Sequence, residues 1–331
     1  MMEREKNMLK INIKKYLLCS LLFIIIITGC GKKDNKNEKQ DDNNQNNIEE
    51  KGAKELSIIN PDSNSRPIAV MINNHYQAVP NHAGLQDAYI VYEINVEGGL
   101  TRLLALFKDK NTAKIGSVRS SRPYFLDYVL ENDAIYTHFG YSDQAKNDIS
   151  SLGINNVNFL IDAGSWRDTN VAYEHTAFTN IENILTTATN KGYRLTTEEK
   201  TLLNYTTDEI ELNKYDNSIV ANNISINHST SQNTSYTYDN NLKIYKRFVN
   251  NNPHTDAITK EQYTTKNIII VRLEVYSNDG YYQNLNNTGV GDGYYITNGY
   301  AIPIKWHKPS RESKTTYTDL NGDEIKINDG N

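Results

Sequence analysis

The sequence has almost no cysteine, little proline and no excess of positive charge. It contains two cysteines, Cys19 and Cys30, so neither a disulfide framework nor a cysteine-based zinc site can form. From Cys30 onward the chain carries 30 Lys/Arg against 38 Asp/Glu, a net charge of −8. Duplex nucleic acids bind to a basic face that displaces counterions, so this balance argues against a nucleic-acid partner.

Long hydrophobic runs are also missing, with one exception near the amino terminus. Basic residues precede the apolar stretch Tyr16 to Ile27, which is too short to span a bilayer as a permanent helix. The stretch leads into Ile27-Thr28-Gly29-Cys30, which resembles the lipobox of bacterial lipoproteins. We therefore predict a signal peptide over residues 1–29 and a lipid anchor on Cys30, which places the protein on the extracytoplasmic face of the cell membrane. An uncleaved anchor helix is the alternative.

The segment after the predicted anchor contains few residues that could enter a core. Residues 30–57 are rich in Asn, Lys, Asp and Glu, and they bury too little apolar surface to offset the entropy of ordering. We predict a disordered tether here. At about 5–6 Å times the square root of its length, it reaches on the order of 30 Å from the membrane.

Strand and helix patterns alternate from Ile58 to about Arg194, only strands and turns follow from about Asp216, and the boundary lies between them. We predict an α+β (α/β-like) amino-terminal domain with a mixed sheet over residues 58–205 and a smaller β-rich domain over residues 206–331. The expected strands of the first domain are Pro67–Asn73, Ala88–Val96, Thr101–Phe107 and Ala134–His138, and its expected helices are Pro123–Asn132, Asp143–Leu152 and Ile181–Lys191.

The second domain is expected to consist of short strands joined by turns. The strands are predicted at residues 224–227, 236–239, 242–249, 266–276, 293–297, 300–306, 315–318 and 324–327. Asn298-Gly299, between two of them, is the preferred pair for a type I′ hairpin turn. The chain stops directly after a strand pattern, so we expect the natural chain to run further.

Gly98-Gly99 separates two of the expected strands and predicts a two-residue hairpin loop. In that register Asn95 faces Arg102, and alternation places Glu93, Glu97 and Arg102 together on one face. The simpler interpretation is an exposed cross-strand salt bridge. The functional interpretation is the polar floor of a cleft, with Glu93 and Glu97 as candidate catalytic residues. Their Cα atoms would lie on the order of 13 Å apart, which is too far for a tight pair of carboxylates.

The segment Ile115–Tyr124 combines two arginines, several hydroxyl groups and an expected helix start at Pro123. Arginine offers a bidentate fork to carboxylate or phosphate, and a helix amino terminus favours negative charge. We therefore predict an anion-binding site, and its expected ligand-binding residues are Arg102, Arg119, Ser120, Arg122 and Tyr124. The alternative is that the arginines only pair with Glu93 and Glu97. No Gly-x-Ser-x-Gly motif surrounds the serines, which argues against a nucleophilic serine.

Two histidines are candidates because each ends or interrupts a patterned segment: His138 as a catalytic residue and His175 as a ligand-binding residue. Arg167 is a candidate ligand-binding residue because Trp166-Arg167-Asp168 could line a sugar-binding or peptide-binding cleft by stacking and bidentate contacts, although loop packing explains it equally well. Packed structural histidines fit the same pattern. No metal-ligand spacing such as HExxH occurs, so we expect no metal and no cofactor. In the second domain, Tyr245–Phe248 and Pro253–Asp256 are unusual in composition but form no catalytic constellation.

Three blocks carry a family resemblance: Arg66–Asn74, Tyr92–Arg102 and Ile115–Phe125. With them the chain from about Ile58 to Asn331 resembles the YerB-like family of Gram-positive lipoproteins, a two-domain family of unknown function. The second half matches more loosely, through Tyr245–Phe248, His254, Asp256 and Asn267–Val271. Glu174-His175 stands where the family often has Pro-His, and the family's terminal strand with a tryptophan is not seen. The resemblance implies a two-domain architecture and a location at the cell membrane, but it implies no particular reaction.

The favoured hypothesis is a membrane-anchored lipoprotein that binds an anionic cell-wall component through an Arg/Glu cleft in the first domain. The alternative is a cell-wall-directed hydrolase or lyase that uses Glu93 or Glu97 as general acid or base. A solute-binding subunit of a transporter is a third option, but the second half lacks the strand and helix alternation such proteins show.

Overall fold

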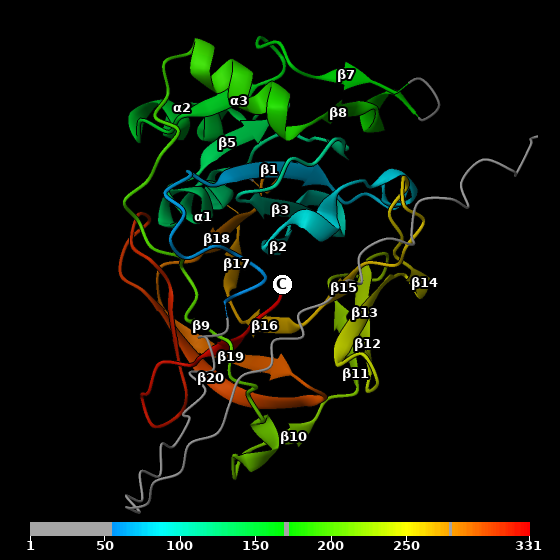
Figure 1. Cartoon of the computed structure of the whole chain (residues 1–331). Coiled ribbons are helices and arrows are strands. Elements are labelled where there is room, and N and C mark those ends of the chain that lie inside the picture. Colours follow the sequence, from blue (N-terminus) through cyan, green and yellow to red (C-terminus); the bar gives the residue numbers. More distant parts are fainter. Residues whose placement is uncertain (1–54, 169–171, 278–279) are drawn as a thin grey trace, which may run out of the picture. The chain divides into compact units, whose positions relative to one another are not determined.

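The computed structural model describes residues 55–168, 172–277 and 280–331. The predicted signal peptide, Cys30 and all but the last residues of the predicted tether lie outside the described residues. Within the described part, no helix is long and apolar enough to cross a membrane. Residues 53–331 form one compact unit, and Figure 1 shows the arrangement of its strands and helices.

A mixed five-stranded sheet lies at the centre of the first half, with the strand order β2-β3-β1-β5-β6. Its strands are β1 (Ile68–Asn73), β2 (Ile90–Asn95), β3 (Thr101–Phe107), β5 (Ile135–His138) and β6 (Asn156–Asn158). Strand β1 runs antiparallel to β3 and parallel to β5. Every residue of β1 is buried, because both faces of the sheet are covered.

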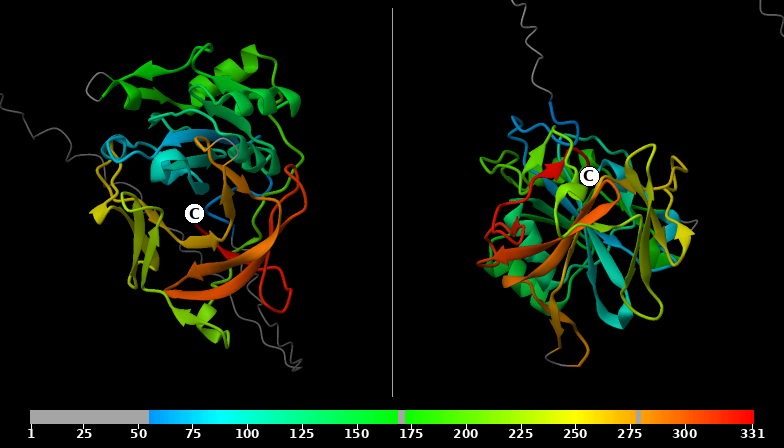
Figure 2. Two further views of the ribbon diagram at one scale, coloured as in Figure 1. Left: turned by 180° about the vertical axis from the view of Figure 1, so that it is seen from behind. Right: turned by 90° about the horizontal axis from the view of Figure 1, so that it is seen from below.

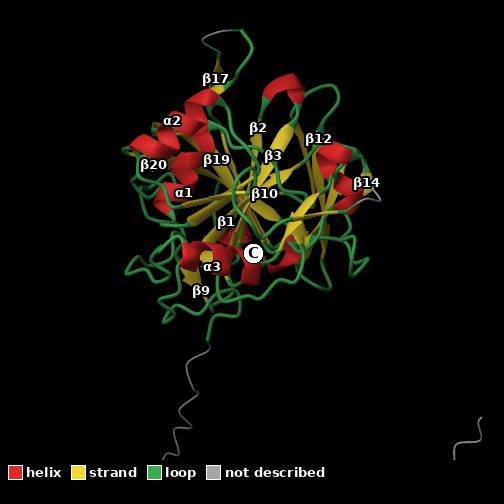
Figure 3. Ribbon diagram, turned by 90° about the horizontal axis from the view of Figure 1, so that it is seen from above, coloured by secondary structure: helices red, strands yellow, loops and turns green. Residues whose placement is uncertain are grey.

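Helices cover the two faces of this sheet. Helices α1 (Leu126–Glu131) and α2 (Asp143–Ser151) pack on one face against Met71 and Leu104. Helix α3 (Ile181–Asn190) packs on the other face against Val70 and Leu103. A small three-stranded sheet lies beside α3 and contains β4 (Ile115–Gly116), β7 (Trp166–Arg167) and β8 (Ala177–Thr179). Figure 3 shows helices lying around the strands.

Side-chain caps set the start of the two longer helices. The Ser142 hydroxyl accepts a hydrogen bond from the Ala145 N–H at the start of α2, and the Asn180 side chain accepts one from the Asn183 N–H at the start of α3. The expected helix Pro123–Asn132 is shorter than predicted. It consists of a 3-10 turn over Pro123–Phe125 followed by the six residues of α1.

The second half is built from strands. One sheet has the order β10-β20-β19-β16 with β21 on the outer side of β20, and another has the order β11-β12-β13-β14 with β15 on β13. The bounds of these strands are β10 Ile219–Val220, β11 Asn223–Asn227, β12 Asn233–Asp239, β13 Ile244–Val249, β14 Asn252–Pro253, β15 Thr264–Thr265, β16 Asn267–Val271, β19 Gly289–Thr297, β20 Tyr300–Lys308 and β21 Thr316–Thr318. Two further pairs are β17 (Glu274–Tyr276) with β18 (Asn284–Asn286), and β9 (Tyr205–Thr206) with β22 (Ile327–Asn328). The two views in Figure 2 show these sheets on the same side of the central sheet.

The expected fold class is confirmed, with a mixed α+β first half and a β-rich second half. The Asn298-Gly299 turn between β19 and β20 has φ angles of 51° and 80°, as a type I′ turn requires. The long strand expected over residues 266–276 is divided into β16 and β17. Only one isolated bridge, at Glu324, and the short β22 occur where a strand over 324–327 was expected.

The predicted register of the hairpin between β2 and β3 is wrong by one residue. Asn95 pairs with Thr101, and Ile94 pairs with Arg102. The connection contains a short 3-10 turn, Glu97–Gly99, in place of a two-residue loop, and both glycines have φ near 70°. Because side chains alternate along a strand, this shift places Glu93 and Arg102 on opposite faces of the sheet.

Candidate functional site

The shift in register divides the predicted polar face into two separate sites. Glu93 turns toward the second half of the chain, whereas Arg102 turns toward the segment that carries Arg119 and Arg122. The predicted Arg/Glu cleft with both carboxylates on one floor therefore does not form.

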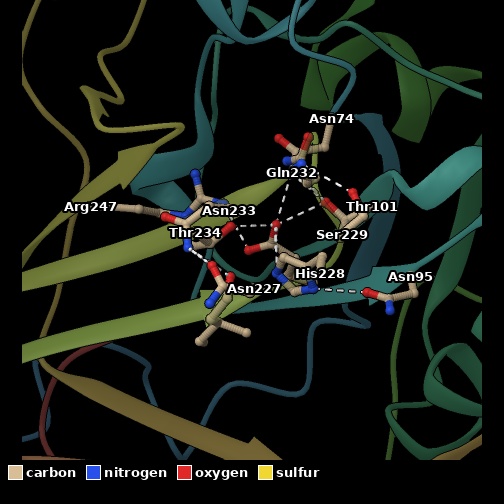
Figure 4. A network of polar contacts seen from close by, with 12 residues as sticks. Asn74, Asn95, Thr101, Asn227, His228, Ser229, Gln232, Asn233, Thr234 and Arg247 are labelled. Atoms are coloured by element: carbon tan, nitrogen blue, oxygen red, sulfur yellow. Dashed lines mark hydrogen bonds and ion pairs between the residues drawn. The ribbon is translucent and has the colours of Figure 1, made fainter.

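Glu93 accepts hydrogen bonds from polar groups of both halves, and these groups are labelled in Figure 4. Its Oε2 accepts a hydrogen bond from Arg247 Nη2 at 2.8 Å. Its Oε1 accepts hydrogen bonds from Asn74 at 3.0 Å, from Thr101 at 2.8 Å and from Thr234 at 2.8 Å. Figure 4 shows Asn74 and Thr101 approaching from the central sheet, and Thr234 and Arg247 from the sheet of the second half. The carboxylate therefore joins the two halves, and both of its oxygens are engaged by the chain's own groups.

The charge state of Glu93 follows from these contacts. Burial favours the neutral form, but the charges of Arg247 and His228 and the hydrogen bonds from Arg247 and Thr234 outweigh it and hold the pKa of Glu93 below its ordinary value. A general acid at neutral pH needs a raised pKa. The arrangement therefore does not support Glu93 as the acid of a hydrolase.

A chain of two histidines continues from Arg247. Arg247 Nη1 donates to His254 Nδ1, His254 Nε2 lies 2.8 Å from His82 Nδ1, and His82 Nε2 lies 2.6 Å from the Asn73 carbonyl oxygen. Because the Arg247 guanidinium can only donate and the Asn73 carbonyl can only accept, each ring donates in the direction of Asn73 and both histidines are neutral. Burial agrees with this state, since it lowers the pKa of His82 to about 4 and the pKa of His254 well below the ordinary value.

The second site, which we call the arginine cluster, consists of Arg102, Arg119 and Arg122 with Glu97 and Glu174. It lies at the edge of the central sheet where β1 and β5 end and β3 begins. The segment that carries Arg119 runs between the ends of β1 and β5, because the Arg119 N–H donates to the Met71 carbonyl and the Arg119 carbonyl accepts from Phe139. Because β1 is parallel to β5 and antiparallel to β3, the carboxyl ends of β1 and β5 and the start of β3 meet at this edge.

Arg102 is the most deeply buried member of the arginine cluster, with 8% of its surface exposed. One Nη donates to the Ser120 carbonyl. No carboxylate among the described residues forms an ion pair with it, whereas Arg119 and Arg122 each have one. Burial and the nearby charges of Arg122 and Arg119 lower the pKa of Arg102 to about 10, and Glu97 opposes this shift. Arg102 is thus a buried cation with incomplete compensation.

Arg122 and Glu97 form the tightest ion pair of the cluster. Arg122 Nε lies 3.0 Å from both carboxylate oxygens, and Arg122 Nη2 lies 2.9 Å from Glu97 Oε2. The Tyr282 ring, from the second half, lies 5.3 Å from the Arg122 guanidinium. Burial favours the neutral form of Glu97, but the hydrogen bonds and charge of Arg122 outweigh it and lower the pKa. As with Glu93, the pairing does not support a general acid.

Arg119 forms the exposed side of the cluster. Its Nη2 lies 3.5 Å from a carboxylate oxygen of Glu174, and the side chain of Glu174 is 64% exposed. His175 is buried next to this pair and accepts a hydrogen bond from Asn73 Nδ2 at 2.8 Å, while its ring stacks on His75 at 5.1 Å. Burial lowers the pKa of His175, and His75 lowers it further.

The other candidate residues contact the cluster indirectly or lie beside it. Tyr124 is buried and donates to the Asn95 carbonyl at 3.0 Å. His138 is fully buried below the cluster, where its Nδ1 donates to the Gly140 carbonyl at 2.8 Å and burial lowers its pKa to about 4. The Arg167 guanidinium lies 4.1 Å from the Tyr173 ring and 4.8 Å from the Phe139 ring. His138 is therefore placed as a structural histidine, without access to a substrate.

The geometry of the arginine cluster fits an anion rather than a metal. Among the described residues no group of three or more His, Cys, Asp or Glu is arranged to hold a metal ion. The predicted helix start at Pro123 gives no anion site of its own, because the helix that follows has six residues. The cluster therefore offers an anion its guanidinium groups. One of them, that of Arg102, is buried and has no carboxylate partner among the described residues.

Comparisons with known proteins agree with the two-part architecture. Residues 56–194 match the family model "Protein of unknown function (DUF3048) N-terminal domain", and residues 223–331 match the corresponding C-terminal domain. The chain is 30% identical over 272 residues to the protein named "Putative lipoprotein YerB" of Bacillus subtilis strain 168, covering 80% of this chain and 76% of that one. The chain belongs to the DUF3048 family. The crystal structure of YerB from Bacillus subtilis superposes with a TM-score of 0.71 and 28% identity, over 80% of this chain and 88% of that one.

Sequence reasoning about this DUF3048 protein missed Arg247, His254, His82 and Asn74. Their signal was present in part, since Tyr245–Phe248 and Pro253–Asp256 were noted for their unusual composition. Nothing local shows that Arg247 pairs with Glu93, because the two are separated by 154 residues in the chain. The YerB-like resemblance drawn from the three sequence blocks is confirmed.

Proposed function

We propose that the protein is a lipid-anchored lipoprotein on the extracytoplasmic face of the cell membrane that binds an anionic cell-wall component at the arginine cluster. The observation that carries the proposal is Arg102, which is nearly buried and forms no ion pair with the described residues. A buried charge without a counterion is costly. A bound anion would lower that cost and add charge-assisted hydrogen bonds.

The similarity to YerB supports the proposed location at the cell membrane. It carries the name of a lipoprotein, and the lipobox-like Ile27–Cys30 precedes a polar segment long enough to hold the folded part away from the bilayer. A ligand in the wall zone would lie within reach of such a protein. Carboxylate and phosphodiester groups are the anions that an arginine fork binds best.

Retention of the full-length, detergent-solubilised protein on purified cell wall tests the proposal. We expect retention that falls steeply with salt, because the contact is ionic. Arg119→Ala, which removes the exposed cation, is expected to lower retention about tenfold, in the range for a charge-assisted contact. Lys305→Ala is the matched control, because Lys305 on β20 is an exposed cation paired with Asp292 on β19.

Equal retention of the Arg119→Ala and Lys305→Ala proteins would contradict the proposal. Release of soluble wall fragments that disappears in Glu97→Gln would instead favour the hydrolase or lyase. Glu97 is ionised and engaged with Arg122, so we expect no such release.

A further inference from the structure

Exposed aromatic rings lie next to the arginine cluster. Among the described residues, the aromatic side chains that are more than one third exposed are Tyr76, Trp166, Tyr173, Tyr215, Tyr276, Tyr281 and Tyr282. Three of them, Tyr76, Tyr173 and Tyr282, pack on residues of the cluster or on their direct neighbours. Exposed aromatic groups that gather beside a charged site indicate a binding surface.

The Tyr173 ring is held on one face and open on the other. The Arg167 guanidinium lies 4.1 Å from the ring, and its Nη1 donates to the Tyr173 carbonyl at 3.0 Å. Phe139 holds the same guanidinium, with its ring at 4.8 Å. Because Arg167 covers one face of the ring while Tyr173 is 75% exposed, the other face is open to solvent. The next residue, Glu174, pairs with Arg119, so this open face lies beside the exposed cation of the cluster.

The Tyr76 ring is the exposed end of a row of three rings. It lies 4.2 Å from the His75 ring, which lies 5.1 Å from the ring of the buried His175. Burial lowers the pKa of both histidines, and the charge of Arg119 adds to this effect, so the row lies next to that cation. Tyr76 itself is 56% exposed. A second aromatic surface therefore lies beside Arg119.

A third ring reaches the cluster from the second half of the chain. Tyr282 lies just before β18, and its ring is 5.3 Å from the Arg122 guanidinium. The main chain is held at this point, because the Gln283 N–H donates to Glu97 Oε1 at 3.4 Å. Tyr282 is 38% exposed. We call Tyr76, Tyr173 and Tyr282 the tyrosine rim.

The rim and the cluster together distinguish between possible ligands. A polymer of phosphate or carboxylate groups without rings would bind the guanidinium groups and leave the rim exposed. A neutral sugar would pack on the rim and leave the buried charge of Arg102 uncompensated. A sugar ring that carries an acidic group satisfies both, because its face of C–H groups packs on an aromatic ring and its anion binds a guanidinium.

We propose that the anion bound by the arginine cluster is part of an acidic glycan, whose sugar rings pack on the tyrosine rim. This inference rests on the proposed function, since it names the class of the ligand for the same site. The charge of such a glycan is complementary to the three arginines, and tyrosine offers it an apolar face together with a hydroxyl group for hydrogen bonds to the sugar.

Three matched probes test the proposal by isothermal titration calorimetry with the full-length, detergent-solubilised protein. Hexagalacturonate carries carboxylates on sugar rings, its methyl ester has the same rings without the charge, and hexaglutamate has the same charge without rings. Hexagalacturonate should bind about tenfold more tightly than hexaglutamate, as expected for one or two ring contacts. It should also bind at least about tenfold more tightly than its ester, which lacks the charge-assisted hydrogen bonds.

Variants of Tyr173 test the rim itself. Tyr173→Ala removes the ring and keeps every guanidinium group, so it should weaken binding of hexagalacturonate roughly three- to tenfold and leave hexaglutamate unaffected. Tyr173→Phe keeps the ring and should restore most of the affinity. Tyr215→Ala is the matched control, because Tyr215 is 41% exposed and lies near Tyr295, at the end of the turn Leu212–Lys214. Circular dichroism checks the fold of each variant.

The outcomes separate this proposal from the proposed function. Equal affinity for hexagalacturonate and hexaglutamate, unchanged by Tyr173→Ala, would overturn the acidic glycan and leave the anion site in place. No binding of hexagalacturonate, with retention on cell wall still dependent on Arg119, would do the same. If the methyl ester bound as tightly as hexagalacturonate and Arg119→Ala changed neither binding nor retention, the proposed function would fail as well.

Discussion

The network around Glu93 and the arginine cluster contain the same kinds of residue and differ in how the charges are balanced. At Glu93 a single carboxylate receives hydrogen bonds from Arg247 and from three neutral side chains. At the cluster, three guanidinium groups face two carboxylates, and the most buried cation, Arg102, has none of its own. The first arrangement holds two parts of the chain together. We propose that an anion from outside completes the second.

This comparison shows that burial of a charge does not by itself identify a functional site. Glu93 and Arg102 are both nearly buried, yet the partners of Glu93 belong to the chain and already satisfy it. A functional site is indicated where the chain's own groups leave a charge uncompensated. The predictions below use this difference, in order of decreasing effect.

The largest effect is expected from Arg247→Ala. The substitution leaves the Glu93 carboxylate buried without a counterion, which costs about 3–5 kcal/mol of unfolding free energy. Chemical denaturation of the wild type and the variant measures the loss. The double variant with Glu93→Gln should recover part of it, because the buried charge is then removed. A loss below about 1 kcal/mol, as in an exposed pair, would contradict the proposed difference between the two regions.

The histidine chain predicts a loss of stability in acid. The pKa of His82 is about 4 in the folded protein and about 6.5 when exposed, so the unfolded chain binds the extra proton between these values. The free energy of unfolding should therefore fall as the pH decreases from about 6.5 to 4, by at most roughly 3 kcal/mol from this residue. Glu93, whose pKa is lowered, adds a further loss at lower pH. A His82→Gln protein should show a smaller slope, and an identical slope would contradict the assignment.

Arg102→Leu should lower retention on cell wall without loss of stability, whereas Arg247→Ala lowers stability. Removing an uncompensated buried cation while keeping apolar volume should leave stability unchanged or raise it by about 1 kcal/mol. Retention on cell wall should fall about tenfold or more, as for loss of a charge-assisted contact. Paired denaturation and retention measurements check both parts. A large loss of stability would place Arg102 with Arg247 as a structural cation.

The smallest effect is expected at the exposed side of the cluster. Glu174→Gln removes a carboxylate that competes for Arg119, and this pair is solvent-exposed. Retention on cell wall should rise about twofold, with no measurable change in stability, as expected for an exposed ion pair. Arg167→Ala, whose guanidinium packs on Tyr173 and Phe139, should change retention less than Arg119→Ala does.

Elements with strong local signals were predictable from the sequence. The strand Thr101–Phe107, the cap of α2 at Ser142 and the Asn298-Gly299 turn follow from hydrophobic pattern, capping and turn preference. The grouping of residues that are close together in the sequence could also be predicted, since Arg102, Arg119 and Arg122 do lie in one cluster.

The register of the hairpin after β2 could not be predicted from local preferences. Gly98 and Gly99 accept left-handed conformations in either register. Partners far away in the sequence make the observed register favourable: Arg122 for Glu97 and Arg247 for Glu93. Such long-range pairing leaves no trace in a window of ten or fifteen residues, and the same holds for the partner of His82.

The ion pair between Glu93 and Arg247 has a consequence for the order of folding. The residues are 154 positions apart, so Glu93 is synthesised well before Arg247. Until it arrives, the early part of the chain holds a carboxylate that its own sheet cannot neutralise. We therefore expect residues 56–194 and 223–331 to unfold as one cooperative unit, because the first region depends on the second for the counterion of Glu93.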